Sequence, residues 1–366
     1  MSRKGDAPEP LPWIAELEPA IHGSFDASMA AGLGRSPAGV LDFSASSNVI
    51  GPPVGVAEAI ASVDVAAYPD REATALRRAL AEHHSVPKHA VVVGNGSTEV
   101  VWAIARAFLG NGDGALIVGP TYGEYDVAAR ACGARIANVR ATAPLFEPDV
   151  AEIAGQLARA APRVVWLCHP NNPTGRTFPV ESLPRLMAVA PESLFVVDEA
   201  YFPLCEGVTS ALPLSGGGHV LVVRSMTKDY ALAGLRVGYA IATPSLLDAV
   251  RRVIPPWSVN ALAQAAALVA LSDGDHPERA RQAVTSARAH LTAGLNALRL
   301  APYPSVANFV LVRVGDAKAM TCALLSRGFA VRDCSSFGLP DCIRIGVRPI
   351  PHQERLLRAL AEALGG

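Results

Sequence analysis

The stretch that decides the fold reads Arg224-Ser-Met-Thr-Lys-Asp-Tyr-Ala-Leu-Ala-Gly-Leu-Arg-Val-Gly-Tyr239. An apolar run that starts at His219 leads into it and predicts a buried strand, and a second apolar run follows it. A lysine between two buried strands is costly unless its amine is neutralised or bonded. One chemistry fits: the amine of Lys228 forms a Schiff base with an aldehyde cofactor, while Ser225 and Arg236 bracket a phosphate. Taken alone, the stretch also fits a surface lysine in a loop.

Strands alternate with helices along the first two thirds of the chain. Short apolar runs at 91–93, 115–118, 135–139, 164–168 and 194–197 predict strands, and helices are expected at 71–84, 94–109, 122–132, 149–160 and 181–190. This alternation predicts an α/β fold with a mostly parallel sheet that is covered on both faces. Such sheets bind ligands at the carboxyl ends of their strands, where the polar motifs of this chain fall.

The pattern changes after residue 246. Helices are expected at about 245–253, 258–272, 276–299, 317–327 and 353–364, with short β segments at 308–314, 330–332 and 343–347. These elements predict a smaller α+β domain. We therefore divide the chain into an N-terminal arm (1–40), a large domain (41–245) and a small domain (246–366).

A glycine-rich turn opens one of the predicted helices with Gly94-Asn-Gly-Ser-Thr-Glu. Glycine allows a close backbone approach, and the free N–H groups at a helix start attract anions. Gly96, Ser97 and Thr98 are therefore candidates to hold a phosphate. An ordinary Ser/Thr cap of a helix explains the same residues.

Two further motifs follow strand ends. His169-Pro-Asn-Asn-Pro-Thr-Gly predicts a rigid turn that points the amide of Asn172 over the sheet edge, where it suits a phenolate oxygen; a plain turn is the alternative. Asp198 ends the run that begins at Leu194, and a carboxylate there needs a partner such as a pyridinium nitrogen, with Tyr201 three residues on. A capping carboxylate or a magnesium ligand of an NTPase fits less well, because no Gly-x-x-x-x-Gly-Lys-Ser/Thr precedes it.

Composition narrows the class of protein. The 366 residues are 50% hydrophobic, the net charge is −1 and no block of like charge occurs, which argues against nucleic-acid or anionic-membrane binding. No apolar run reaches the length of a membrane span, and the N-terminus lacks the apolar core of a signal peptide. The six cysteines are scattered without C-x-x-C spacing, which favours reduced thiols in a cytoplasmic protein over disulfides or a metal site.

From about His22 to the C-terminus, these motifs resemble a pyridoxal-phosphate enzyme of fold type I, the aspartate aminotransferase superfamily. The resemblance implies an aspartate-aminotransferase-like α/β large domain, a small α+β C-terminal domain and pyridoxal 5'-phosphate (PLP) as cofactor. Lys228 would bind the cofactor and move the proton, Asp198 would pair with the ring nitrogen, and Asn172 and Tyr201 would contact the phenolate oxygen. It also implies that Tyr122 stacks on the ring. The implied phosphate ligands are Gly96, Ser97, Thr98, Ser225, Arg236 and, from the partner subunit of a homodimer, Tyr68.

Two subfamilies share this pattern. Histidinol-phosphate aminotransferases have most of the motifs. The motifs are more similar in sequence to those of the threonine-phosphate decarboxylase family of cobalamin synthesis. The motifs that carry this resemblance are His22-Gly-Ser, Asp42-Phe-Ser-Ala-Ser, Tyr68-Pro-Asp, His83-His-Ser-Val-Pro, Pro256-Trp-Ser-Val-Asn and Arg332-Asp-Cys-Ser. The departures are Ser24, Ser46, Val49 and the Gly338-Leu-Pro ending, the last of which looks more like an aminotransferase.

In both subfamilies, the resemblance places four residues at a small, phosphorylated amino-acid substrate. They are His22, Asn48, Arg332 and Arg344, of which Arg344 is the candidate for the α-carboxylate or part of the phosphate-bearing substrate. Arg348 and Asn308 are weaker candidates. A surface ion pair or a packed polar residue is the alternative for each of them.

Three functions are therefore open. The first hypothesis is a decarboxylase that converts O-phospho-L-threonine to aminopropanol phosphate, with Arg344 holding the departing carboxylate weakly. The second is an aminotransferase of the histidinol-phosphate type, in which Lys228 removes the Cα proton. The third is a non-catalytic regulator fused to a DNA-binding module, which we disfavour because no basic helix-turn-helix segment precedes residue 40.

Overall fold

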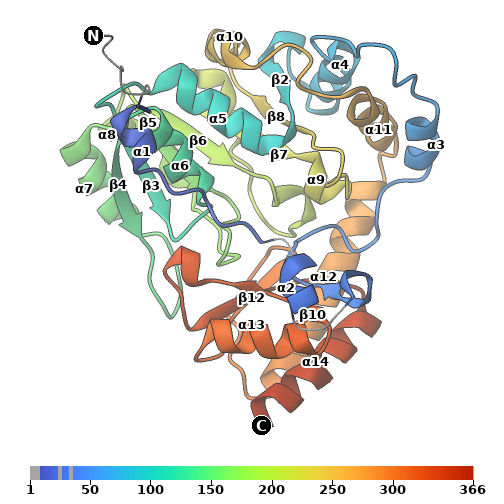
Figure 1. Ribbon diagram of the computed structural model, residues 1–366. Coiled ribbons are helices and arrows are strands. Elements are labelled where there is room, and N and C mark those ends of the chain that lie inside the picture. The colour runs from blue at the N-terminus through green and yellow to red at the C-terminus, as the bar shows by residue number, and fades with distance from the viewer. Residues whose placement is uncertain (1–8, 24–26, 33–35, 366) are drawn as a thin grey trace, which may run out of the picture.

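The computed structural model describes residues 9–23, 27–32 and 36–365 (Figure 1). Two bodies make up the molecule: a large α/β body that carries a wide sheet, and a smaller body built from the C-terminal segments. In the predicted arm, residues 1–8, 24–26 and 33–35, and with them the departure at Ser24, lie outside the described residues. The described part of the arm contains two short α-helices, α1 (Pro12–Ala15) and α2 (Ala27–Gly32), and a 3-10 turn at Pro37–Gly39.

The sheet of the large body has seven strands in the order β2-β8-β7-β6-β5-β3-β4. Their bounds are β2 Val91–Gly94, β3 Gly114–Gly119, β4 Arg135–Arg140, β5 Val164–Cys168, β6 Leu194–Asp198, β7 Val220–Ser225 and β8 Gly238–Ile241. Strand β8 runs antiparallel to its neighbours β2 and β7, whereas the other pairs are parallel. Both faces of the central strands are buried, so these strands are apolar throughout rather than alternating.

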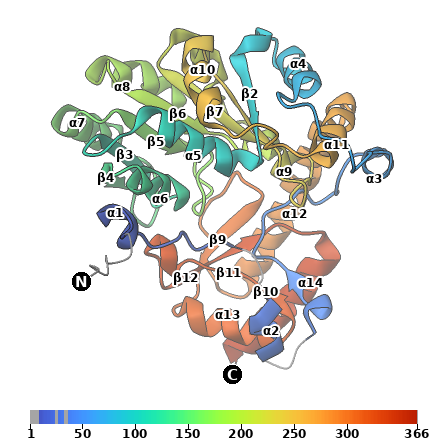
Figure 2. The ribbon, with the colours of Figure 1, turned by 45° about the horizontal axis from the view of Figure 1, so that its top comes forward.

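Helices cover both faces of this sheet (Figure 2). One face packs against α5 (Gly96–Phe108), α6 (Glu124–Ala131) and α10 (Pro244–Val253). The other face packs against α7 (Val150–Ala160) and α8 (Leu183–Val189) at one end, and against α3 (Val56–Ala61), α4 (Thr74–His83) and α11 (Ala261–Ser272) at the other. Because α9 (Met226–Asp229) starts immediately after β7, it lies at the carboxyl edge of the sheet.

The smaller body has a three-stranded antiparallel sheet in the order β11-β12-β9. Its strands are β9 Phe309–Arg313, β11 Arg332–Asp333 and β12 Cys342–Gly346, and its helices are α12 His276–Ala297, α13 Ala317–Ser326 and α14 Ile350–Gly365. The apolar faces of these helices close one core over the sheet.

Strand β1 (Leu41–Asp42) lies at the predicted start of the large domain, but it pairs in parallel with β10 (Phe329–Ala330) of the smaller body. Phe43, which is fully buried, joins the same core. The chain therefore crosses from the smaller body to the larger one after β1. The boundaries at 40/41 and 245/246 stay predictions.

The arm links the two bodies. Helix α1 contacts α6 of the large body, and both views show α2 beside the smaller body (Figures 1 and 2). Among the described residues, no helix combines the length and the apolar character that a membrane span requires.

Candidate active site

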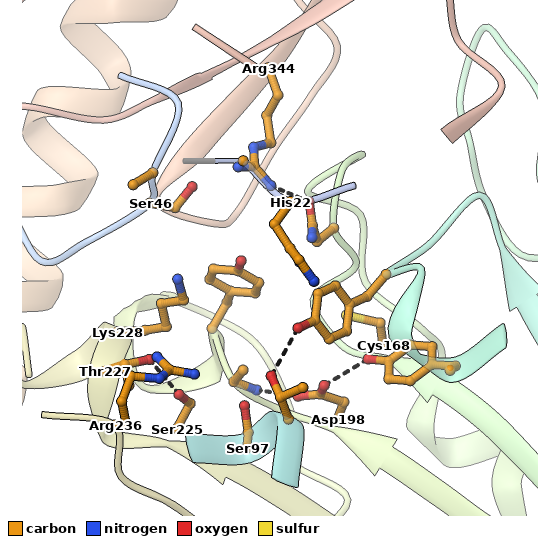
Figure 3. Close-up of a pocket in the computed structure, with 18 residues that line it drawn as sticks. His22, Ser46, Ser97, Cys168, Asp198, Ser225, Thr227, Lys228, Arg236 and Arg344 are labelled. Atoms are coloured by element: carbon orange, nitrogen blue, oxygen red, sulfur yellow. Dashed lines mark hydrogen bonds between the residues drawn. The ribbon is translucent and has the colours of Figure 1, made fainter. Parts of the chain in front are cut away.

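A cavity of about 460 Å³ opens at the carboxyl edge of the large sheet, between the two bodies. Segments that are far apart in the sequence line it, namely the arm, the start of α5, the strand ends of β5, β6 and β7, and β12. Most of the residues that the sequence analysis selected meet here: His22, Ser97, Thr98, Tyr122, Asn172, Asp198, Tyr201, Ser225, Lys228, Arg236 and Arg344. Figure 3 shows Ser97, Ser225 and Arg236 at one end of the cavity and Arg344 at the other.

Lys228 lies on the single turn α9, so its amine projects from the sheet edge into the cavity. Burial lowers its pKa from 10.5 to about 8, and the positive charges of Arg344 and Arg236 act in the same direction. The amine also lies 5.7 Å from the ring centre of Tyr201. Lys228 is therefore a partly neutral amine close to physiological pH, as a nucleophile requires.

Asp198 ends β6 and is buried. Its Oδ2 accepts a hydrogen bond from the hydroxyl of Tyr125 at 2.7 Å, and its Oδ1 accepts one from the backbone N–H of Ala200 at 2.9 Å. Burial raises the pKa of Asp198, and these two bonds oppose that shift. The buried carboxylate is thus held in one orientation, and a cationic ring nitrogen beside it would compensate its charge.

The end of the cavity that holds Ser97, Ser225 and Arg236 is a concentration of anion-binding groups. Helix α5 begins at Gly96, and the hydroxyl of Ser225 lies 2.6 Å from that of Thr227. Gly96 has a φ of 82°, and a Cβ at this position would lie 2.7 Å from Nη2 of Arg236. Arg236 itself has a φ of 60°, a left-handed conformation that costs a non-glycine residue of the order of 1–3 kcal/mol. Helix start, hydroxyls and guanidinium therefore converge at Gly96, whose positive φ favours glycine.

These residues fit a group that carries an aldehyde, a ring and a phosphate. The amine of Lys228, the fixed carboxylate of Asp198 and the pocket of N–H and hydroxyl donors offer one partner for each part. Tyr122 lies beside them with its hydroxyl 3.0 Å from that of Thr98, and burial raises its pKa. The buried hydroxyl of Tyr201, whose pKa burial raises to about 12, remains protonated and able to donate.

Arg344 reaches the cavity from β12. Its Nη1 donates to the side-chain oxygen of Asn172, its Nη2 donates to the carbonyl of Ser44 at 2.7 Å, and its guanidinium lies 5.1 Å from the ring centre of Phe309. Among the described residues, none accepts a hydrogen bond from its buried Nε. A fixed guanidinium of this kind binds carboxylate or phosphate oxygens.

His22 brings the arm to the cavity. Its Nε2 lies 2.6 Å from Oε1 of Glu124, and its ring centre lies 5.7 Å from that of Tyr122. The other oxygen of Glu124 accepts from the indole N–H of Trp102 at 2.6 Å. The hydrogen bond with His22, more than any other contact, lowers the pKa of Glu124, while burial opposes it.

Four selected residues do not line the cavity: Gly96, which lies next to Ser97 at its edge, Asn48, Arg332 and Tyr68. Asn48 is buried, with its amide nitrogen 2.6 Å from the carbonyl of Asp229 and 3.1 Å from the ring of His276. Arg332 donates through Nη2 to the carbonyl of Ile21 and to the hydroxyl of Ser336, both at 2.7 Å.

Tyr68, also outside the cavity, is 84% exposed on the surface, where its ring contacts that of Trp257. The weaker candidates Asn308 and Arg348 donate to the carbonyls of Ser47 and Asp42.

Sequence reasoning missed four residues of this site: Tyr125, Glu124, Thr227 and Cys168. Tyr125 follows Tyr122 by three residues, and that spacing on a helix start was a readable signal for two rings near one site. Cys168 is buried, and burial raises the pKa of its thiol to about 12, so it is not a nucleophile at neutral pH. Among the described residues, no group of three or more His, Cys, Asp or Glu side chains is arranged to hold a metal ion.

Residues 39–364 match the family "Aminotransferase class I and II". The chain is 36% identical over 364 residues to histidinol-phosphate aminotransferase 2 of Pseudomonas aeruginosa, which covers 96% of this chain and 97% of that protein. It superposes on histidinol-phosphate aminotransferase from Sinorhizobium meliloti in complex with pyridoxal-5'-phosphate with a TM-score of 0.87, at 26% identity and 97% of both chains. L-threonine-O-3-phosphate decarboxylase from Porphyromonas gingivalis is also similar, with a TM-score of 0.77 at 27% identity over 89% of this chain and 100% of that chain.

Proposed function

The chain belongs to the class I and II aminotransferase family, and on that premise we propose that it is an aminotransferase of the histidinol-phosphate type. The 36% identity to the Pseudomonas aeruginosa enzyme over almost the whole of both chains carries this proposal. Family membership confirms the predicted aspartate-aminotransferase-like fold, the dependence on PLP and the expected enzymatic activity, that of a transferase or a decarboxylase.

When bound, PLP supplies an aldehyde that condenses with amines and a ring that takes up electrons from the substrate's Cα. We assign the capture of the cofactor to Lys228, because with a pKa of about 8 roughly a tenth of its amine is neutral at pH 7. With the cofactor held there, the amine of Lys228 at the cavity wall would be the base that takes the proton from the substrate's Cα.

The other residues bind and orient. Asp198, fixed by Tyr125, is proposed to hold the proton on the ring nitrogen, and Ser97, Ser225 and Arg236 are proposed to hold the phosphate. At the far end, Arg344 is proposed to bind the acidic group of the substrate.

The positions of the donors support this assignment of roles, because anion-binding groups lie at both ends of the cavity and the amine of Lys228 lies between them (Figure 3).

The threonine-phosphate decarboxylase is the second candidate, and it was the first choice from sequence motifs alone. The Porphyromonas gingivalis enzyme supports it, since this chain covers all of that structure. Curated relatives at 36% and 38% identity are histidinol-phosphate aminotransferases, however, and they support the aminotransferase better. The same residues would hold the cofactor in both reactions, which differ in the bond of the substrate's Cα that breaks.

A turnover assay separates the two candidates. Protein loaded with PLP is incubated with histidinol phosphate and 2-oxoglutarate, or with O-phospho-L-threonine, and glutamate and CO₂ are measured. Glutamate formation supports the proposal, whereas CO₂ release from O-phospho-L-threonine without glutamate would replace it with the decarboxylase. In either case Lys228→Ala is expected to lower the rate at least 10²-fold, because it removes the positioned base. A Lys228→Ala variant that keeps its biological role without activity would instead favour the regulator.

We also propose a homodimer, which remains a prediction. Tyr68, Trp257 and Val54 are exposed apolar side chains of the large body, as expected for a surface that a second copy covers. Sedimentation equilibrium of the purified protein tests it: a species of about twice 38.1 kDa supports the dimer, and a monomer at micromolar concentration contradicts it. The cytoplasmic location likewise stays a prediction.

A further inference from the structure

Glu124 is a buried carboxylate to which the proposed reaction gives no role. It lies in the first turn of α6 and is 7% exposed. Each of its oxygens meets one donor at 2.6 Å: His22 of the arm at Oε1, and the indole N–H of Trp102 on α5 at Oε2. A carboxylate that is withdrawn from water persists only where such bonds replace its hydration.

The arm is held at two more points next to this pair. The carbonyl of Ile21 accepts from Arg332 of the smaller body at 2.7 Å. Gly23 is packed so closely that a Cβ there would lie 2.9 Å from the carbonyl of Ser44 and 3.0 Å from Nη2 of Arg344. Segment 21–23 therefore contacts both bodies and passes directly beside the guanidinium proposed for the substrate.

His22 depends on Glu124 for its position. Its side chain is 47% exposed, so packing alone does not fix the ring. Among the described residues, the carboxylate of Glu124 is the one recorded hydrogen-bond partner of the imidazole. Loss of that bond would free the ring to rotate into solvent, away from Tyr122 and the cavity.

We propose that Glu124 is a positioning residue for substrate binding. Its carboxylate fixes the imidazole of His22 at the cavity mouth and keeps segment 21–23 closed beside Arg344, so the substrate meets an imidazole and a guanidinium that are already in place. The substrate role of His22 and Arg344 rests on the proposed function. The positioning of the arm does not, and it is testable in protein without cofactor.

The variant pair Glu124→Gln and Asp126→Asn isolates this role. Glu124→Gln keeps the size of the side chain and removes its charge. Asp126 lies in the same turn of α6, but it faces solvent and pairs with Arg130 at 2.7 Å, so Asp126→Asn removes the same charge from the helix without touching the arm. His22→Ala breaks the same pair from its exposed side, where folding is not at risk.

Limited proteolysis of the cofactor-free protein measures how often the arm detaches from the two bodies. Thermolysin cleaves before large apolar residues, and Ile21 is 66% exposed. Cleavage follows the population in which the arm has detached. Glu124→Gln and His22→Ala are expected to be cut at Ile21 roughly 3- to 30-fold faster than wild type, the range for a partly screened charge-assisted bond, and Asp126→Asn at the wild-type rate. Equal cleavage of Glu124→Gln and Asp126→Asn would overturn the proposal.

Steady-state kinetics of the loaded enzyme tests the substrate side. For Glu124→Gln, KM for the phosphorylated substrate is expected to rise by a similar factor while kcat stays within about twofold, because binding is lost rather than chemistry. A fall in kcat at unchanged KM contradicts a positioning role in substrate binding. If wild type turns over neither candidate substrate, the proposed function fails, yet the cleavage experiment still decides the role of Glu124 in the arm.

Discussion

Replacing Tyr125 by phenylalanine is expected to destabilise the ionised carboxylate of Asp198 without disturbing the packing of the core around it. The tyrosine ring is fully buried and stacks on Trp166, with ring centres 5.2 Å apart and planes 7° from parallel. Phenylalanine keeps that stack. What is lost is one hydroxyl that donates to Oδ2 of Asp198 at 2.7 Å.

The expected magnitude follows from the charge of the acceptor. A hydrogen bond to an ionised group contributes about 1.5–3 kcal/mol, roughly twice a neutral one. Asp198 would retain only the N–H of Ala200, so its ionised form would be left partly uncompensated in a buried site. We therefore expect the free energy of unfolding of the cofactor-free protein to fall by about 1.5–3 kcal/mol at pH 8.

The loss should depend on pH. Burial raises the pKa of folded Asp198 above its unfolded value of 3.8, so its contribution to stability falls as the pH rises from the unfolded pKa through the folded one. Loss of the Tyr125 donor raises the folded pKa further. The variant's extra loss is thus largest where the wild-type carboxylate is ionised, and it becomes smaller as the pH is lowered through that raised pKa.

Urea unfolding of wild type and variant at several values between pH 5 and pH 8 measures this loss. Tyr239→Phe is the matched control, because its buried hydroxyl lies 2.8 Å from His84. Burial lowers the pKa of His84 to about 3, so this partner stays neutral over the whole range and the loss should be about 0.5–1.5 kcal/mol at every pH. An equal, pH-independent loss in both variants would refute the assigned role of Tyr125.

Three other changes test the cofactor end and the sheet beneath it. The rate at which PLP adds to the cofactor-free protein should increase as the pH rises through about 8, because only the neutral amine of Lys228 attacks. Stopped-flow absorbance measures this rate, and a rate that is constant from about pH 6 to 9 contradicts the prediction. Arg236→Ala should weaken PLP binding by about 10- to 100-fold in a fluorescence titration, and Arg130→Ala, on the surface, should leave it unchanged. Arg224→Met should lower the free energy of unfolding by about 3–5 kcal/mol in urea, since Arg224 and Glu199 form a buried pair at 2.6 Å; a loss below about 1 kcal/mol would show that the pair is not held as described.

Local patterns in the sequence were sufficient for the large sheet and for the residues at its strand ends. Each central strand is a short apolar run, and the polar residue that ends it, such as Asp198, or follows it, such as Asn172, reaches the same edge because parallel strands end together. A residue's place at a strand end depends on its own neighbours in the sequence, so a single sequence reveals it.

Contacts between distant segments were not predictable in this way. A short strand at Leu41 can be read from the sequence, but its pairing as β1 with β10 joins segments near opposite ends of the chain, and no local pattern marks that pairing. Asn48 was selected from a motif, yet its hydrogen bonds go to Asp229 and His276. Glu124 meets His22 across 102 residues, and only the folded arm brings the two together.

The first turn of α6 contains both a residue at the strand-end site and a residue that contacts a distant segment. Glu124 and Tyr125 are adjacent in the sequence, but successive helical residues point about 100° apart, so one side chain reaches the arm and the other reaches Asp198. The stack of Tyr125 on Trp166 anchors this turn to β5, which lies in the middle of the sheet. The arm beside the proposed substrate site and the carboxylate beside the cofactor ring are therefore placed by one rigid element, and any shift of α6 would displace both together.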